Sequence, residues 1–150
     1  MKIKYKEDKK SLSPSYSIVN NLYSLNSNFI KSFLKKKCQK GKIARACLHK
    51  NKSDKIHQMI IFQKYNYVHG VKKHPKKEKL YLLISGSQMI KIYDDKKKII
   101  KTLKLDNNNF ICKIPKNTWH NNITVSKESL HIEIIEGPFN RSKDSIYFNK

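Results

Sequence analysis

The chain has 150 residues, of which 38% are hydrophobic, and this length suits one domain with a single core. It carries 33 lysines and arginines against 11 acidic residues, a formal net charge of +22, and its three cysteines include no close pair. This argues against a disulfide framework and a cysteine-rich zinc site. No apolar stretch approaches the roughly 20 residues of a membrane span, and the lysine-rich start lacks the apolar segment of a secretory signal, so we expect a soluble, cytoplasmic protein.

The positive charge admits two interpretations. A protein this basic attracts nucleic acid and anionic surfaces through long-range electrostatics. However, lysine far outnumbers arginine, and lysine, asparagine and isoleucine share A/T-rich codons, so genome composition alone would enrich them. The lysine runs do not alternate with aromatics as on a base-stacking platform, and no helix-turn-helix, zinc-finger or RNP-like pattern is present. We favour a solvated basic surface and keep a basic nucleic-acid-binding protein as an alternative.

The first forty residues predict an arm followed by a helix. Residues 1–19 are polar and lysine-rich, which indicates a mobile arm or a loosely docked strand. Over residues 20–39, apolar residues recur at spacings of three and four, as on one face of a helix. Ser24 or Ser27 is the expected cap, and Gly41 the expected stop. The apolar stripe comprises Leu22, Leu25, Phe29, Ile30, Phe33 and Leu34.

After Gly41 the pattern becomes that of short strands with turns between them. The apolar or alternating runs are 59–62, 80–84, 89–93, 99–105, 110–114, 123–125 and 130–135. Many short strands with no helix between them favour an all-β, mainly antiparallel sandwich or barrel, with the N-terminal helix packed outside. We expect residues 1–40 to form the arm and helix, 41–140 the barrel and 141–150 a C-terminal tail.

Two histidines border strands about forty residues apart. His74 precedes one strand, and His120 ends the segment 115–120, Pro-Lys-Asn-Thr-Trp-His. A small barrel can bring such positions to one interior point, where two imidazoles would begin a metal or ligand site. Lys72 and Lys79 lie in the same stretch as His74, and their charge favours an anionic ligand such as a phosphate, nucleotide-sugar or carboxylate.

In these segments the chain resembles the cupins, and within them the small WbuC-type cupin-fold proteins associated with surface-polysaccharide gene clusters. The resemblance covers about residues 20–140. It implies a jelly-roll barrel that binds a sugar or nucleotide-sugar, or that carries out isomerase- or epimerase-type chemistry on one. The segments that carry the resemblance are 45–49, 58–61, 115–120 and 131–139.

The first cupin motif is altered in this chain. Lys72 stands at the position of its first histidine and Lys79 at the position of its glutamate. An ammonium group has no lone pair to give a metal, so we expect a metal-free pocket. Glu78 is one residue away, and alternation along a strand turns it outward unless a bulge intervenes. The alternative is one divalent metal ion held by His74, Glu78 and His120, in a metal-dependent enzyme of unknown reaction.

The last strand offers a second polar pair. His131 and Glu133 are two residues apart and therefore share one face of that strand. They are interpreted as a salt-bridged or hydrogen-bonded pair, or as a general base or a support for His120. We take His120, Glu133 and His131 as the candidate catalytic residues.

The remaining candidates would line a pocket and bind substrate. Arg45 and His49 come just before the barrel and are expected at its rim. Tyr81 and Tyr93 are expected to stack on a sugar ring, as an alternative to ordinary strand aromatics. Lys72 and Lys79 complete the set as anion-binding groups. The expected partners are an anionic or sugar-like small molecule and a second copy of the chain paired through barrel edges, rather than nucleic acid.

Overall fold

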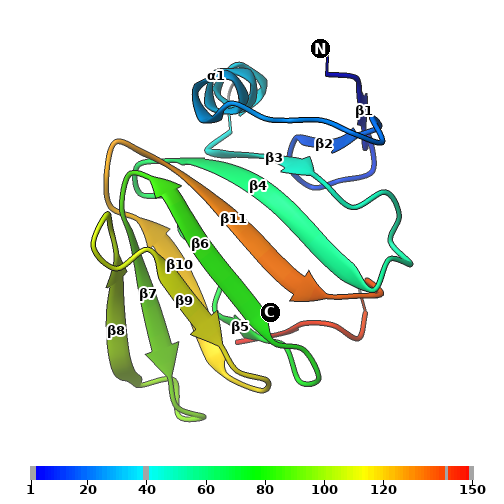
Figure 1. Ribbon diagram of the computed structural model, residues 1–150. Helices are drawn as coiled ribbons and strands as arrows, with labels where there is room; N and C mark the ends of the chain where they lie inside the picture. Colours follow the sequence, from blue (N-terminus) through cyan, green and yellow to red (C-terminus); the bar gives the residue numbers. More distant parts are fainter. Residues whose placement is uncertain (1–2, 39–40, 141, 149–150) are drawn as a thin grey trace.

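The computed structural model describes residues 3–38, 41–140 and 142–148, and it contains one helix and twelve strands over that range (Figure 1). Helix α1 spans Ser27–Cys38. The strands are β1 Tyr5–Glu7, β2 Ser15–Ile18, β3 Ile43–Cys47, β4 Ile56–Lys64, β5 Lys72–Lys73, β6 Lys79–Ser85, β7 Gln88–Tyr93, β8 Ile99–Leu105, β9 Ile111–Ile114, β10 Trp119–Thr124, β11 Glu128–Glu136 and β12 Ile146–Tyr147.

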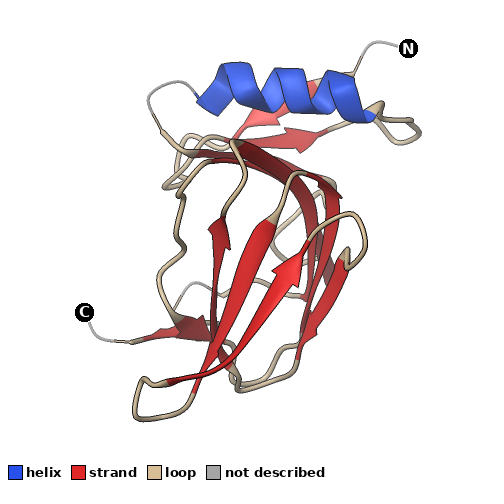
Figure 2. Ribbon diagram, turned by 90° about the vertical axis from the view of Figure 1, so that its left-hand side faces the viewer, coloured by secondary structure: helices blue, strands red, loops and turns tan. Residues whose placement is uncertain are grey.

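Two sheets face each other. The large sheet has the order β1-β2-β3-β4-β11-β6-β9, and the small sheet has the order β12-β5-β10-β7-β8. All neighbouring strands are antiparallel except β2 and β3, which are parallel. The chain passes from one sheet to the other in the turns between β6 and β7 and between β8 and β9, which is jelly-roll connectivity. The predicted all-β jelly roll is confirmed, and the helix lies outside it (Figure 2).

Helix α1 is shorter at its start than the predicted range of 20–39. Its cap is Asn26, rather than Ser24 or Ser27. The Asn26 Oδ1 accepts hydrogen bonds at 2.9 and 3.2 Å from the backbone N–H groups of the two residues after Ser27. An asparagine in this position satisfies N–H groups that would otherwise lack a partner, so the helix begins here. The predicted end at Gln39 lies outside the described residues.

The helix packs on the outer face of the large sheet, against β3 and β4 (Figure 1). Ile30 and Leu34 are buried there, whereas Leu22, predicted to belong to the same stripe, is 84% exposed because it precedes the helix. The core beneath the helix contains Ile30, Leu34, Cys38, Ala44, Ala46, Ile60, Phe62 and Leu130. This packing uses the outer face of the sheet and leaves the inner face to the small sheet.

Both ends of the chain extend the sheets. The expected arm contains β1 and β2, and β2 pairs with β3 while burying Tyr16 and Ile18. The aromatic ring of Tyr16 lies 5.4 Å from that of Phe33 on the helix. At the other end, β12 joins the small sheet beside β5. The division at residues 40 and 140 remains a prediction.

The space between the sheets has an apolar part and a polar part. The apolar part comprises Tyr81, Leu83, Ile90, Leu105, Cys112 and Ile114. The buried polar residues include histidines, amides, a lysine and a glutamate. All three cysteines are free and buried. No helix in the described part of the chain is long and apolar enough to cross a membrane.

Candidate functional site

Strands β6 and β11 place a lysine and a glutamate on the inner face of the large sheet. Along β6, Lys79 and Tyr81 are buried, while Leu80 between them points outward. The register pairs Glu133 on β11 with Tyr81, so Glu133 also faces inward, diagonally from Lys79. Simple alternation therefore brings two charged groups from separate strands into the barrel.

Lys79 and Glu133 form a buried ion pair. The Lys79 Nζ lies 3.2 Å from the Glu133 Oε1, and the two side chains are 1% and 10% exposed. Nζ also lies 3.5 Å from the Tyr81 hydroxyl. Burial lowers the pKa of Lys79 to about 8 even though Glu133 acts to raise it. Burial alone would raise the pKa of Glu133, but the Lys79 and Lys72 ammonium groups outweigh it and hold that pKa below its ordinary value.

His74 and His120 meet inside the barrel as the sequence predicted. His74 follows β5 and His120 lies on β10, and their ring centroids are 5.7 Å apart. Each Nδ1 lies against a backbone carbonyl oxygen, that of Asp144 at 2.7 Å and that of Thr118 at 2.8 Å. A carbonyl only accepts, so Nδ1 carries the proton in both rings and Nε2 keeps its lone pair. Both Nε2 atoms are buried and make no hydrogen bond within the protein.

These two imidazoles are neutral at physiological pH. Burial, followed by the charge of Lys79, lowers the pKa of His120 to about 3 and that of His74 to about 4. Lys72 adds to the effect on both. A neutral imidazole with a bare, desolvated nitrogen can accept a proton or a hydrogen bond from a bound molecule.

His131 lies in a hydrogen-bonded polar network between the sheets. The Gln88 side-chain amide donates to the His131 Nδ1 at 2.8 Å, so the buried Nε2 carries the proton and has no partner within the protein. Burial lowers the pKa of His131 to about 4. The ring lies 5.7 Å from that of Tyr81. The network also contains Gln63, His69, Thr124 and Ser129.

Sequence reasoning missed this network. Its members are ordinary polar residues, and the available signal was a polar residue at an inward position of a strand, such as Gln88 two residues before the inward Ile90 on β7. Lys72, which the sequence did single out, is half-buried and pairs in register with His120. It therefore lies at the same end of the barrel as the histidines.

Three predicted site residues lie elsewhere. Tyr93 is on the outer face of the small sheet, where its hydroxyl donates to Asn121 at 3.2 Å. His49 stacks on His57 with ring centroids 4.0 Å apart, near the β3–β4 turn. Arg45 donates to the Ser13 hydroxyl at 2.6 Å. These residues do not join the cluster around His74 and His120.

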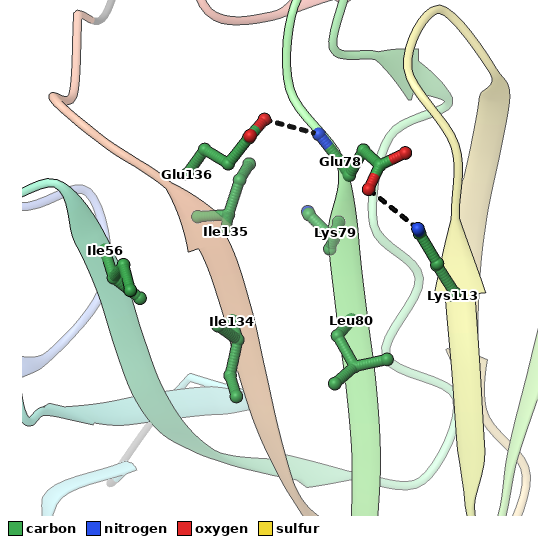
Figure 3. Close-up of a pocket in the computed structure, with 8 residues that line it drawn as sticks. All are labelled: Ile56, Glu78, Lys79, Leu80, Lys113, Ile134, Ile135 and Glu136. Atoms are coloured by element: carbon green, nitrogen blue, oxygen red, sulfur yellow. Dashed lines mark hydrogen bonds and ion pairs between the residues drawn. The ribbon is translucent and has the colours of Figure 1, made fainter.

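Glu78 also points away from the histidines. It lies on the outer face of the large sheet and forms an ion pair with Lys113 at 2.8 Å (Figure 3). A cavity of about 210 Å³ opens beside this pair, lined by Ile56, Glu78, Lys79, Leu80, Lys113, Ile134, Ile135 and Glu136. This groove is on the outside of the sheet, so it is not the pocket predicted at the barrel mouth.

The residues present do not fit a cupin-type metal. In the described ranges no three His, Cys, Asp or Glu residues are grouped so as to hold an ion. The predicted carboxylate ligand, Glu78, faces outward, and the ammonium group of Lys79 stands inside in its place. A divalent ion beside His74 and His120 would also be repelled by that ammonium group.

Comparison with known proteins identifies the family. The family model described as "FdtA: WxcM-like, C-terminal" matches residues 27–147. The chain belongs to this family. No curated protein sequence matches the WxcM-like chain.

Solved structures share the fold of this WxcM-like chain. The capsular polysaccharide assembling protein CapF from Staphylococcus aureus has a TM-score of 0.63 and 16% identity over 73% of the chain. CapF with the inhibitor 3-isopropenyl-tropolone has a TM-score of 0.61 and 18% identity over 73% of the chain. The oxalate decarboxylase formate complex from Lactobacillus farciminis has a TM-score of 0.52 and 14% identity over 63% of the chain. The chain shares the jelly-roll fold of these proteins.

The match spans 30%, 33% and 27% of those three proteins, respectively. The chain thus corresponds to less than half of each of these proteins. Identities this low show a shared fold and carry no further functional conclusion.

Proposed function

We propose that the protein binds an anionic sugar or nucleotide-sugar inside the barrel and carries out isomerase- or epimerase-type proton transfer on it. The observation that carries this proposal is the pair of bare, neutral Nε2 atoms on His74 and His120 beside the Lys79–Glu133 pair. A buried polar atom without a partner in the protein is costly unless a ligand or water supplies one.

The charges inside the barrel favour an anion. Lys79 and the half-buried Lys72 provide two positive charges, and Glu133 provides one negative charge. The net positive charge suits a phosphate or carboxylate group. The neutral His131 Nε2–H and the Tyr81 hydroxyl add donors for sugar oxygens.

The geometry supports removal and return of a proton next to a carbonyl group. One imidazole Nε2 accepts the proton from carbon, and the Lys79 ammonium group stabilises the negative charge that develops on oxygen. The second imidazole then holds a position from which the proton can return to another carbon. His74 and His120 are the proposed acid–base residues, Glu133 fixes the charge of Lys79, and His131 orients the substrate.

The biological context of the proposal is surface-polysaccharide synthesis. CapF is named as a capsular polysaccharide assembling protein. The WbuC-like segments 45–49 and 131–139 point to the same setting. A cytoplasmic location and a homodimer belong to this proposal, and light scattering of the purified protein tests the dimer.

The test combines binding with proton exchange. We would titrate the protein with UDP-glucose, UDP-glucuronate and their 4-keto derivatives, and follow loss of carbon-bound hydrogen in D₂O by NMR. The proposal expects exchange with at least one keto sugar, and its loss in His120→Gln. His49→Gln is the matched control, because His49 is partly exposed beyond the end of β3 and stacks on His57 rather than on His74 or His120. Binding and exchange equal in both variants would contradict it.

A metal-dependent enzyme is the second candidate, favoured only by the two bare Nε2 atoms. Elemental analysis of protein purified without a histidine tag distinguishes the two. Metal well below one ion per chain, unchanged in His74→Ala and His120→Ala, excludes the metal, whereas a full equivalent lost in both variants supports it.

A further inference from the structure

Among the described residues, Lys79 is the one lysine that is buried, at 2% exposure. Its amine is held between the Glu133 carboxylate at 3.2 Å and the Tyr81 hydroxyl at 3.5 Å. The neutral His74 and His120 are near enough for the Lys79 charge to lower their pKa. A buried ion pair is not needed for stability, because apolar residues of similar volume often stabilise a core equally well. The two neutral imidazoles near this pair therefore suggest a role beyond folding.

These surroundings suit an amine that attacks a carbonyl. A lysine needs a free amine, a nearby base and a site shielded from water to form an imine. Burial lowers the pKa of Lys79 from 10.5 to about 8, which leaves more free amine at pH 7 than an exposed lysine has. Lys72 and His69 interact electrostatically with Glu133 and are partly exposed. The buried ion pair therefore lies close to residues that a molecule in solvent can reach.

We propose that Lys79 is a nucleophile that forms an iminium bond with a carbonyl group of the bound molecule. This rests on the proposed function and narrows its substrate class to an anionic aldehyde or ketone. The Nζ–carbon bond forms, the carbonyl oxygen leaves as water, and the lysine ammonium becomes an iminium. The reaction is R–NH₃⁺ + O=C → R–NH⁺=C + H₂O, with no net change in charge.

The neighbouring residues have defined tasks in this step. As the Lys79 amine gives up its ammonium proton and attacks carbon, an imidazole Nε2 of His74 or His120 passes that proton to the carbonyl oxygen. A second proton then moves from nitrogen to the resulting hydroxyl, which leaves as water. The iminium keeps the positive charge, so its ion pair with Glu133 persists. It also withdraws electrons from the adjacent carbon, which makes the proton there easier for a neutral imidazole to remove.

The experiment traps the iminium by reduction. The full chain is incubated at pH 7 with dihydroxyacetone phosphate and sodium cyanoborohydride, and modified lysines are located by peptide mass mapping. Lys79 should be labelled at least about tenfold faster than Lys113, an exposed lysine that is also ion-paired to a glutamate. Dihydroxyacetone, without the phosphate, should label Lys79 less than the phosphate ester does.

Two variants separate this inference from the proposed function. Lys79→Arg keeps the charge beside Glu133 but forms no imine, and Lys113→Arg is the matched surface control. Binding of dihydroxyacetone phosphate is measured without reductant, by the shift of the histidine ring signals. Binding with labelling at Lys79 supports the inference. Binding with Lys79 labelled no faster than Lys113 overturns the inference and leaves the proposed function, whereas neither binding nor labelling counts against both.

Discussion

The buried ion pair allows a quantitative test of how the barrel interior is held together. Glu133→Gln keeps the shape of the side chain and removes its charge, so the main effect is to leave the Lys79 ammonium group without its anion. At 3.2 Å and an effective dielectric constant of about 20, the attraction lost is about 5 kcal/mol. Broken buried pairs typically cost about 3–5 kcal/mol, so we expect a loss of unfolding free energy in that range at pH 7.

Urea unfolding of paired variants measures this loss. The matched control is Glu78→Gln, because Glu78 and Lys113 lie only 2.8 Å apart but have side chains that are 41% and 61% exposed. Solvent screens such a pair, and the expected cost is below about 1 kcal/mol. Lys79→Met combined with Glu133→Gln should recover most of the loss. Equal, small costs for Glu133→Gln and Glu78→Gln, or no recovery in the double variant, would refute this account of the ion pair.

Three further predictions concern acid, the turns and nucleic acid. Burial lowers the folded-state pKa values of His74, His120 and His131 below 6.5, so the unfolded chain binds more protons than the folded chain between pH 6.5 and about 4. The melting temperature should therefore fall steeply as the pH is lowered through that range. A melting temperature that does not change with pH would contradict neutral imidazoles in the folded protein. Gly86→Ala should lower the unfolding free energy by roughly 2–4 kcal/mol, because the φ of Gly86 is +84° and an added Cβ would lie 2.3 Å from a backbone oxygen. Gly70→Ala, where the nearest atom to an added Cβ is at 3.6 Å, should lower it by less than about 1 kcal/mol. Equal losses in the two variants, measured by chemical denaturation, would contradict the turn geometry. Fluorescence anisotropy with single-stranded DNA and RNA should show no binding at 150 mM salt, and tight binding with a steep salt dependence would favour the nucleic-acid alternative.

Local pattern was enough to predict much of the barrel and part of its interior. The alternation along β6 gives Lys79 and Glu78 opposite directions, and the structure has them on opposite faces. The meeting of His74 and His120 was predicted because a small barrel can bring the ends of two strands to one interior point. The ion pair between Lys79 and Glu133 was not predicted, since it depends on the register of β6 against β11.

The misplaced residues show where single-sequence reasoning stops. Tyr93 was predicted to line the pocket, but Gln88 and Ile90 occupy inner positions of β7. Because side chains alternate along the strand, Tyr93 faces outward. His49 was expected at the rim, but it stacks on His57, a partner eight residues away that the strand pattern did not suggest. Each error concerns which face of a strand or turn a side chain takes, which depends on pairing with distant segments.

Nitrogen-15 NMR of the histidine rings tests the central claim most directly, because it reports the protonation of each Nε2 and its contact with a ligand. At pH 6.5 His74 and His120 should both be neutral with the proton on Nδ1, and their Nε2 signals should move when a 4-keto nucleotide-sugar is added. His49, which is partly exposed beyond the end of β3 and stacks on His57, should not respond. Protonated rings at pH 6.5, or Nε2 signals that stay in place at millimolar concentrations of every sugar in the panel, would contradict a ligand site between these two imidazoles.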